Sequence, residues 1–305
     1  MKSAILNLIK SLFRGVLSLC VIVPMLAFVG CEAGEHTPDI PQLPEISPYS
    51  ILYQSTDGEI VQPSNKVFDT NVVSNVYENG VGVITFDDPI TIIKDYAFSN
   101  CTTLTSITIP DSVKKIGSCV FAGCNNLTKF EGEYASEDGS ALIIDGKLLA
   151  VVGNRSQAHY TIPNGVQSIG EAAFYGCGYL KSVTIPEGCY SIGRNAFAYC
   201  VKLESVTLPS SLEYIRDWAF VSCINLSGKI TIPSSVLEIG NGVFDGCTNL
   251  TKIYCMPIEP PVLDGWLFGG GNNDDNVMIF VPNQSVSLYE ISSGWSEYAG
   301  RIVSL

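Results

Sequence analysis

The sequence predicts a β-rich solenoid of parallel strands, built from coils of about 23 residues that end in short helical turns. Phenylalanine recurs at steps of 23, 53, 23, 23 and 24 residues, and each phenylalanine is followed three residues later by cysteine. A fixed period of this length is typical of repeat architectures, in which each unit is too small to bury its own apolar face and packs on its neighbours. The pairs are Phe98 and Cys101, Phe121 and Cys124, Phe174 and Cys177, Phe197 and Cys200, Phe220 and Cys223, and Phe244 and Cys247.

Composition narrows the class of function. The 305 residues are 46% hydrophobic and 15% charged, which favours a large folded core over disorder. The formal net charge is -13, so the surface is acidic. Nucleic-acid binding needs basic patches that release counterions, and docking on anionic lipid needs them too, so neither partner is expected. Only His36 and His159 could supply imidazole chemistry.

Residues 1–30 have the composition of a secretory signal: a basic start, an apolar run from Val16 to Val29, and small residues before Cys31. A transmembrane helix needs about 20 apolar residues, and Arg14 and Pro24 leave the run shorter than that.

The end of this signal, Phe28-Val29-Gly30-Cys31, resembles a bacterial lipobox, with Phe28 where Leu, Val or Ile is usual. The resemblance implies cleavage before Cys31 and lipid attachment to it, which anchors a chain without spanning the membrane. Ordinary secretion is the alternative. Residues 31–48 are rich in proline and acidic side chains, which predicts an extended tether.

Residues 49–82 are expected to form an N-terminal cap that covers the first coil. Alternating apolar residues lie next to Asp57-Gly58 and Asn79-Gly80, which predicts short strands joined by tight turns.

Residues 83–255 are expected to form the stacked coils. Ahead of each repeated proline the residues alternate, as in Ser182-Val183-Thr184-Ile185, which predicts a half-buried strand that the proline ends. A second short extended stretch follows, as in Val113 to Ile116, and the Phe-x-x-Cys segment is long enough for one helical turn. Stacking the coils then places phenylalanine on phenylalanine and isoleucine on isoleucine, which makes the core.

The repeated pattern L-x-x-I-x-I-P-x-x-V-x-x-I-G-x-x-A-F-x-x-C resembles the BspA-like, or Treponema-type, leucine-rich repeats of bacterial surface proteins, from Val83 to about Ile253. Residues 131–160 interrupt the period and resemble a variant coil of that family, with a hairpin at Asp145-Gly146. Residues 256–305 resemble its terminal cap module, with Tyr289, Trp295 and Tyr298 as anchors. The resemblance implies a leucine-rich-repeat solenoid and a role in adhesion.

Two rows of residues are expected to point outward from the long strands, thirteen and fifteen residues before each phenylalanine. Exposed threonine is common in strands, so an ordinary exposed strand surface accounts for the rows without any ligand. The functional interpretation is a binding face for an extended ligand, a glycan or a protein segment. The first row is Thr85, Thr108, Thr161, Thr184, Thr207 and Thr231, and the second holds Ser106, Ser182, Ser205 and Lys229, with Lys252 in the following unit.

Other chemical signals are weak. The repeated cysteines are expected to be buried free thiols, because no C-x-x-C spacing for zinc or redox work occurs. The loop Asn272–Asn276 has oxygen ligands suited to Ca²⁺ but lacks the spacing of a calcium loop. No nucleophile elbow, phosphate loop or HExxH stretch is present. We therefore expect no enzyme activity, no cofactor and no metal.

The sequence thus predicts an exported lipoprotein of the outer membrane or cell surface that is not catalytic. Its expected partner is a host or cell-surface protein, or a glycan. Two alternatives remain: an accessory glycan-binding lipoprotein of a polysaccharide-uptake system, and a structural protein of the envelope.

Overall fold

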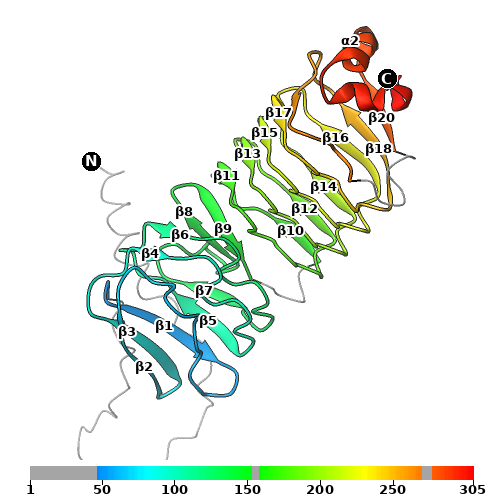
Figure 1. Cartoon of the computed structure of the whole chain (residues 1–305). Helices are drawn as coiled ribbons and strands as arrows, with labels where there is room; N and C mark the ends of the chain where they lie inside the picture. The colour runs from blue at the N-terminus through cyan, green and yellow to red at the C-terminus, as the bar shows by residue number, and fades with distance from the viewer. Residues whose placement is uncertain (1–46, 153–157, 270–276) are drawn as a thin grey trace, which may run out of the picture. The chain divides into compact units, whose positions relative to one another are not determined.

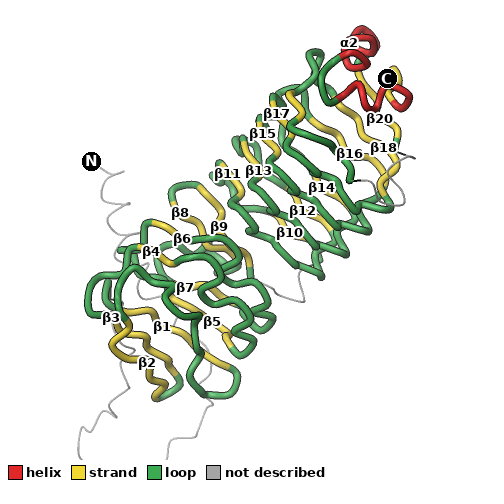
Figure 2. The backbone as a smooth tube through the Cα atoms, viewed as in Figure 1, coloured by secondary structure: helices red, strands yellow, loops and turns green. Residues whose placement is uncertain are grey.

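The computed structural model describes residues 47–152, 158–269 and 277–305, which belong to one compact unit, Leu43–Leu305. The predicted signal, Cys31 and most of the tether lie outside the described residues. Strands make up most of the regular structure, and the described helices are confined to the C-terminal end (Figures 1 and 2). The predicted β-rich solenoid is confirmed.

The long strands of successive coils pair in parallel and in register, as β10, β12 and β14 show side by side in Figure 1. Successive side chains of each strand point alternately into the core and to solvent: Val183 is 1% exposed, whereas its neighbour Thr184 is exposed. These strands form two parallel sheets, β10 (His159–Thr161), β12 (Ser182–Thr184) and β14 (Ser205–Thr207), then β16 (Gly228–Ile232), β18 (Leu250–Cys255), β20 (Met278–Val281) and β21 (Ile302–Ser304).

A second ladder runs along another side of the coils and is made mostly of two-residue strands. Its buried member is the repeated isoleucine, as in the pair Ile192 and Ile215. Seven strands share one sheet, β8 (Ala141–Ile144), β9 (Lys147–Val151), β11 (Ser168–Ile169), β13 (Ser191–Ile192), β15 (Tyr214–Ile215), β17 (Glu238–Ile239) and β19 (Val262–Leu263), and β4 (Ile92–Ile93) pairs separately with β6 (Lys115–Ile116).

The Phe-x-x-Cys segments form the corners of the coils, and their phenylalanine rings stack inside. Phe197 lies 4.6 Å from Phe174 and 5.1 Å from Phe220, between ring centroids, with nearly parallel planes. The residue two before each phenylalanine has positive φ, a conformation that side chains other than glycine resist. Turns of this kind close each coil in the space of a few residues, which lets the rings face each other.

The stack is broken once, at the variant coil. Phe121 is covered on its C-terminal side by the edge of Phe130, and Phe174 on its N-terminal side by the edge of Tyr160. Between these two aromatic pairs the chain forms the antiparallel hairpin of β8 and β9, which turns at Asp145-Gly146. The buried side chains accordingly form two core clusters, one on each side of the break.

The N-terminal strands are arranged differently from the simple stack that the sequence predicts. Strand β1 (Ser50–Ser55) pairs antiparallel with β3 (Val81–Phe86) on one side and with β5 (Leu104–Thr108) on the other. Strand β2 (Val72–Glu78) makes a hairpin with β3, and β7 (Lys129–Glu131) pairs with β5. The first two coils therefore do not place their long strands next to each other, because β1 lies between them.

The coils also continue beyond residue 255, where we expected the period to end. Strand β19 pairs with β17, and Phe268 lies 6.5 Å from Phe244 between ring centroids. Pro257 and Leu263 stand eleven and five residues before Phe268, as in the regular coils. One more coil therefore precedes the terminal helices, which are η2 (Asn283–Ser285), α2 (Val286–Ile291) and η3 (Trp295–Arg301).

Those helices cover the last coil through three buried aromatic side chains. The hydroxyl of Tyr289 donates to the carbonyl of Pro257 at 2.9 Å, and Trp295 Nε1 donates to the carbonyl of Pro261 at 2.7 Å. The hydroxyl of Tyr298 accepts from the backbone N–H of Leu267 at 2.8 Å. Each ring is nearly or fully buried, and each polar end has a partner, as buried Tyr and Trp require.

Candidate binding face

The structure brings part of the predicted threonine row together. Thr161, Thr184 and Thr207 occupy paired positions on β10, β12 and β14, and all three are exposed. Thr231 is exposed on β16, the next strand of the stack. Neighbouring strands lie about 4.8 Å apart, so these hydroxyls form a regular row that crosses the strands.

The N-terminal members of the row, Thr85 and Thr108, do not lie on adjacent strands. Thr85 and Thr108 are separated by β1, which pairs with the strands of both. Thr108 is only 6% exposed and Ser106 only 5%. The Oγ of Ser106 lies 3.2 Å from Oε1 of Gln54 on β1, so a side chain of the inserted strand occupies the hydroxyl of Ser106.

The second row follows the same division. Ser182 pairs with Ser205 and with His159, whose Nδ1 lies 2.7 Å from Ser182 Oγ. Lys229 and Lys252 are directly paired on β16 and β18 and both are exposed. The predicted residues that share an open face are therefore those of the coils after the break.

Beyond Thr231 the first row continues into two aromatic residues. Thr231 pairs with Tyr254, and Tyr254 pairs with Phe280. Their rings stack at 4.8 Å between centroids with an interplanar angle of 11°. We did not predict this pair. The spacing that locates the threonines misses both residues, because Tyr254 stands fourteen residues before Phe268 instead of thirteen and no phenylalanine follows Phe280 in the sequence.

The two lysines of the second row lie against these rings. Lys229 Nζ is 4.3 Å from the centroid of Tyr254, and Lys252 Nζ is 6.0 Å from that of Phe280. Attraction between an ammonium and the face of a ring fixes the direction of the side chain while leaving the ammonium in contact with water. We call the exposed side of β10, β12, β14, β16, β18 and β20 the strand face. At its C-terminal end these four residues form a basic site, which we call the lysine–aromatic patch (Lys229, Lys252, Tyr254 and Phe280).

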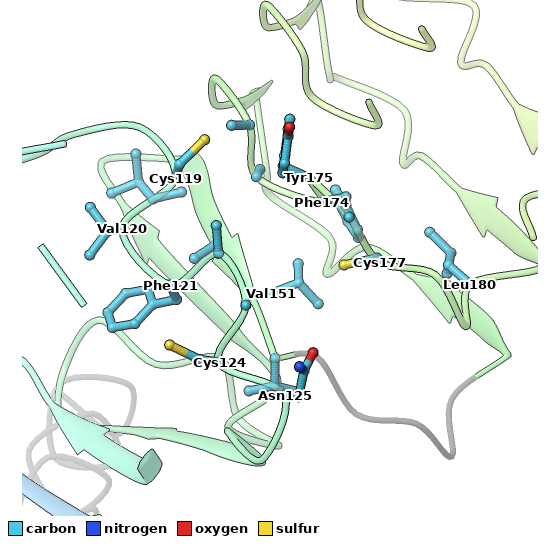
Figure 3. A pocket seen from close by; sticks show the side chains of 18 of the residues that line it. Cys119, Val120, Phe121, Cys124, Asn125, Val151, Phe174, Tyr175, Cys177 and Leu180 are labelled. Atoms are coloured by element: carbon cyan, nitrogen blue, oxygen red, sulfur yellow. The ribbon is translucent and has the colours of Figure 1, made fainter. Parts of the chain in front are cut away.

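A pocket opens elsewhere, at the break in the phenylalanine stack (Figure 3). One wall is the corner 119–125 and the other is 172–180, and Val151 at the end of β9 lies between them. The pocket holds ≈ 820 Å³, counted with the solvent at its mouth. Its cause is visible in the sequence, because no Phe-x-x-Cys corner occurs between Phe130 and Tyr160.

The titratable groups of the pocket are poorly suited to catalysis. Burial raises the pKa of the thiols of Cys124 and Cys177 to about 12 each, and it also raises the pKa of Cys119. Thiolates are the reactive form, so these thiols are held in their unreactive state at neutral pH. Burial likewise raises the pKa of Tyr160 to about 12, and its hydroxyl lies 2.8 Å from that of Ser140.

A ridge of aromatic side chains follows the outside of the corners. Tyr175 and Tyr199 lie 5.3 Å apart between centroids, and Arg194 lies 4.5 Å from the centroid of Trp218. Trp266 on the added coil is 51% exposed. Exposed aromatic residues are enriched in interfaces, so this corner ridge is a second surface of the solenoid with the composition of a binding site.

The other sequence expectations concern the cysteines, metal binding and membrane spanning. The nine cysteines that the structure describes are all free thiols. In the described ranges no group of three or more His, Cys, Asp or Glu side chains could hold a metal ion, and the loop Asn272–Asn276 lies outside them. Among the helices described, none has the length and apolar character needed to cross a membrane.

Solved structures with a similar fold come from several bacteria. The pneumococcal vaccine antigen PcpA has 21% sequence identity and a TM-score of 0.46, with 66% of this chain and 55% of that chain covered. A leucine rich cell surface protein from Faecalibacterium prausnitzii has 25% identity and a TM-score of 0.43, covering 70% of this chain and 50% of that one. This chain therefore spans about half the length of both.

A leucine-rich repeat protein from Bacteroides capillosus has 36% identity and a TM-score of 0.31, with 35% of this chain and 88% of that chain covered. No curated protein matches the chain.

The repeats themselves match a family model. Six copies of the BspA type leucine rich repeat region cover residues 74–136 and 153–260, more than half of the chain. The gap in the match coincides with the hairpin of β8 and β9. Membership of such a repeat family points to a binding or adhesion role and away from a catalytic one. The chain belongs to the BspA-type leucine-rich-repeat family.

Proposed function

We propose that this chain is an exported, lipid-anchored recognition protein of the bacterial surface, which adheres to a host or cell-surface partner through its strand face. The observation that carries the proposal is the open row Thr161, Thr184, Thr207 and Thr231, which continues into the lysine–aromatic patch. Rigid strands hold these side chains at a regular spacing, so many weak contacts form together with little loss of side-chain entropy.

The family and the N-terminal sequence support the surface location. Solved proteins with similar repeats include one described as a cell surface protein. The signal-like residues 1–30 and Cys31 supply export and a lipid anchor, and the proline-rich residues 31–48 supply a tether.

A binding assay on the purified chain tests the role of the strand face. Arrays of glycans and of matrix and cell-surface proteins first identify a ligand. The double variant Thr184→Glu/Thr207→Glu then places two carboxylates in the middle of the row, and we expect it to abolish binding of that ligand.

The matched control carries the same charges elsewhere. Asn164 and Ser234 are exposed and lie in the turns after the prolines, off the strand face. We expect Asn164→Glu/Ser234→Glu to bind as the parent does. Equal binding by parent and Thr184→Glu/Thr207→Glu, with loss on Trp266→Ala, would place recognition on the corner ridge and overturn the assignment to the strand face.

A further inference from the structure

The lysine–aromatic patch places two positively charged side chains next to each other on an acidic chain. The chain is acidic, with a formal net charge of -13, and three described basic side chains, Lys129, Lys181 and Arg216, have a carboxylate partner within 4.0 Å. Lys181 pairs with Glu204 at 3.5 Å and Lys129 with Glu131 at 2.9 Å. Within the described residues, neither Lys229 nor Lys252 has a carboxylate within 4.0 Å.

The two ammonium groups are also held close together. Lys229 and Lys252 are direct partners on adjacent parallel strands, an arrangement in which like charges repel. Each ammonium is attracted by the ring on the following strand, Tyr254 or Phe280. The rings offset part of the repulsion without neutralising either charge, so the pair remains free to bind an anion.

Polar groups continue from the patch along the face. Ser205 and Thr207 occupy β14, the neighbouring strand of the stack, and both are exposed. Ser182 and Thr184 come next, in register with them. A ligand that lies across the strands thus meets two ammonium groups at one end and paired hydroxyls further on.

We propose that this face binds an anionic polysaccharide, with Lys229 and Lys252 contacting its carboxylate or sulfate groups and the serine and threonine hydroxyls contacting its sugar hydroxyls. Charge-assisted hydrogen bonds from the ammonium groups supply the stronger contacts. Hydroxyls both donate and accept, which suits sugar hydroxyls that do the same.

The same features disfavour other acidic polymers. An extended acidic peptide gains most from backbone hydrogen bonds at a sheet edge. The strands β16, β18 and β20 are already paired in one sheet with β21, so this face offers side chains alone. Nucleic acid needs a larger basic surface to release its counterions, and the acidic chain repels it.

Affinity electrophoresis of the purified full chain tests the inference, which rests on the proposed strand-face function. The gels contain polygalacturonate, dextran sulfate, neutral dextran or poly-glutamate. We expect retardation by at least one of the two acidic polysaccharides and none by dextran. Added salt should weaken the retardation, because exposed charges are screened.

Lys229→Gln/Lys252→Gln should weaken that retardation at least about tenfold, since it removes two charge-assisted contacts. The matched control is Lys115→Gln/Lys202→Gln, which changes the net charge equally at exposed sites outside the patch and should bind as the parent does. Unaltered thermal unfolding verifies that both variants are folded.

The outcomes separate the inference from the function beneath it. Equal loss in both double variants, retardation by neutral dextran, or stronger retardation by poly-glutamate overturns the inference. So does an array ligand whose binding needs Thr184 and Thr207 but is unaffected by Lys229→Gln/Lys252→Gln, and that result leaves the proposed function standing. A ligand that binds equally well to Thr184→Glu/Thr207→Glu and to Lys229→Gln/Lys252→Gln would instead overturn the proposed strand-face function itself.

Discussion

At the scale of single residues, the repeated cysteine has a role beyond filling space. The thiol of Cys223 donates to the backbone carbonyl of Phe197, in the preceding coil, at 3.1 Å, and Cys200 does the same to Phe174. Cysteine is small enough for the crowded corner and still satisfies a buried carbonyl. For Cys177 the preceding phenylalanine of the repeat, Phe121, lies on the other wall of the pocket. The repeat therefore explains why the residue is cysteine where alanine would also fit.

The stacked phenylalanines should dominate stability. Phe197 is fully buried between Phe174 and Phe220. Phe197→Ala should lower the free energy of unfolding by ~3–5 kcal/mol, the usual cost of a large cavity in a core. Urea unfolding followed by circular dichroism measures it. Tyr199→Ala, at a ring that is 48% exposed, is the control and should cost far less. Equal midpoints for both variants would contradict this packing.

Asp87 gives the N-terminal strands a dependence on pH. It stands where later coils have proline, and its carboxylate accepts from Thr70 Oγ1 at 2.6 Å and from the backbone and side chain of Asn71. These bonds lower the pKa of Asp87 from 3.8 to about 2. Between those two pH values the unfolded chain binds more protons, so the contribution is complete above about pH 4 and is lost as pH falls toward 2.

Asp87→Asn should therefore lower the urea midpoint at pH 7, and the gap to the parent should narrow between pH 4 and pH 2. The neighbouring exposed Asp88 provides the control variant, Asp88→Asn, with a midpoint close to that of the parent at both ends of the range. A gap that stays constant with pH would refute the role of the carboxylate.

At the scale of elements, the corner turns are where the coil stores strain. Ala172 has φ 57° and Trp218 has φ 53°, in the left-handed region that residues with a Cβ avoid. Gly242 fills the equivalent place in a later coil, where an added Cβ would meet Trp218 at 2.6 Å. The position two residues before each repeated phenylalanine therefore keeps a similar positive φ, although its side chain differs from coil to coil.

Ala172→Gly should consequently stabilise the chain by up to about 1 kcal/mol, because glycine adopts positive φ without steric cost. The adjacent Ala173 is 5% exposed and is absent from the positive-φ residues of the described chain, so Ala173→Gly should instead destabilise it. Differential scanning calorimetry of the two variants gives the comparison. The same sign for both would show that Ala172 is not strained.

The elements that sequence analysis located are those with a local period. The residues at the repeated phenylalanine, isoleucine and leucine positions are buried because each coil repeats the same environment. The insertion of β1 depends on which distant strand it pairs with, and its own alternation carries no such information. The lysine–aromatic patch was missed for a related reason, since Phe280 joins the face only through the register of β20 on β18.

At the scale of the whole molecule, the solenoid after the break carries the face and the part before it carries the inserted strand. The long-strand ladder β5–β7 ends at the variant coil, where the backbone N–H of Phe130 donates to the carbonyl of Gly139. The ladder β10–β12–β14 begins on the other side, and among the described strands it is the second ladder, through β11 and β9, that reaches back to the hairpin of β8 and β9. Two core clusters result, joined by this hairpin.

Hydrogen exchange should report this division. Amides of β12 to β15 lie in a continuous stack and should exchange slowly, by global opening. Amides of the hairpin β8–β9 should exchange faster, because the hairpin lies at the break, where the phenylalanine stack of the regular coils is interrupted. The variant Phe197→Ala should speed exchange in β12 to β15 and leave β1 to β3 near the parent rate, as expected for near-neighbour coupling in a repeat protein. Uniform acceleration throughout would indicate a single cooperative unit.

The broken phenylalanine stack also decides how a tethered adhesin would respond to being pulled. If the proposed lipid anchor precedes the N-terminal strands and the proposed ligand binds the last coils, tension from flowing liquid must cross the variant coil. There the stack of phenylalanine rings that joins neighbouring coils is interrupted, with Phe130 against Phe121 and Tyr160 against Phe174, so the solenoid should yield here before the regular coils. Extension there would lengthen the molecule under load and lower the force on the bound end, while the coils that bind the ligand stay folded.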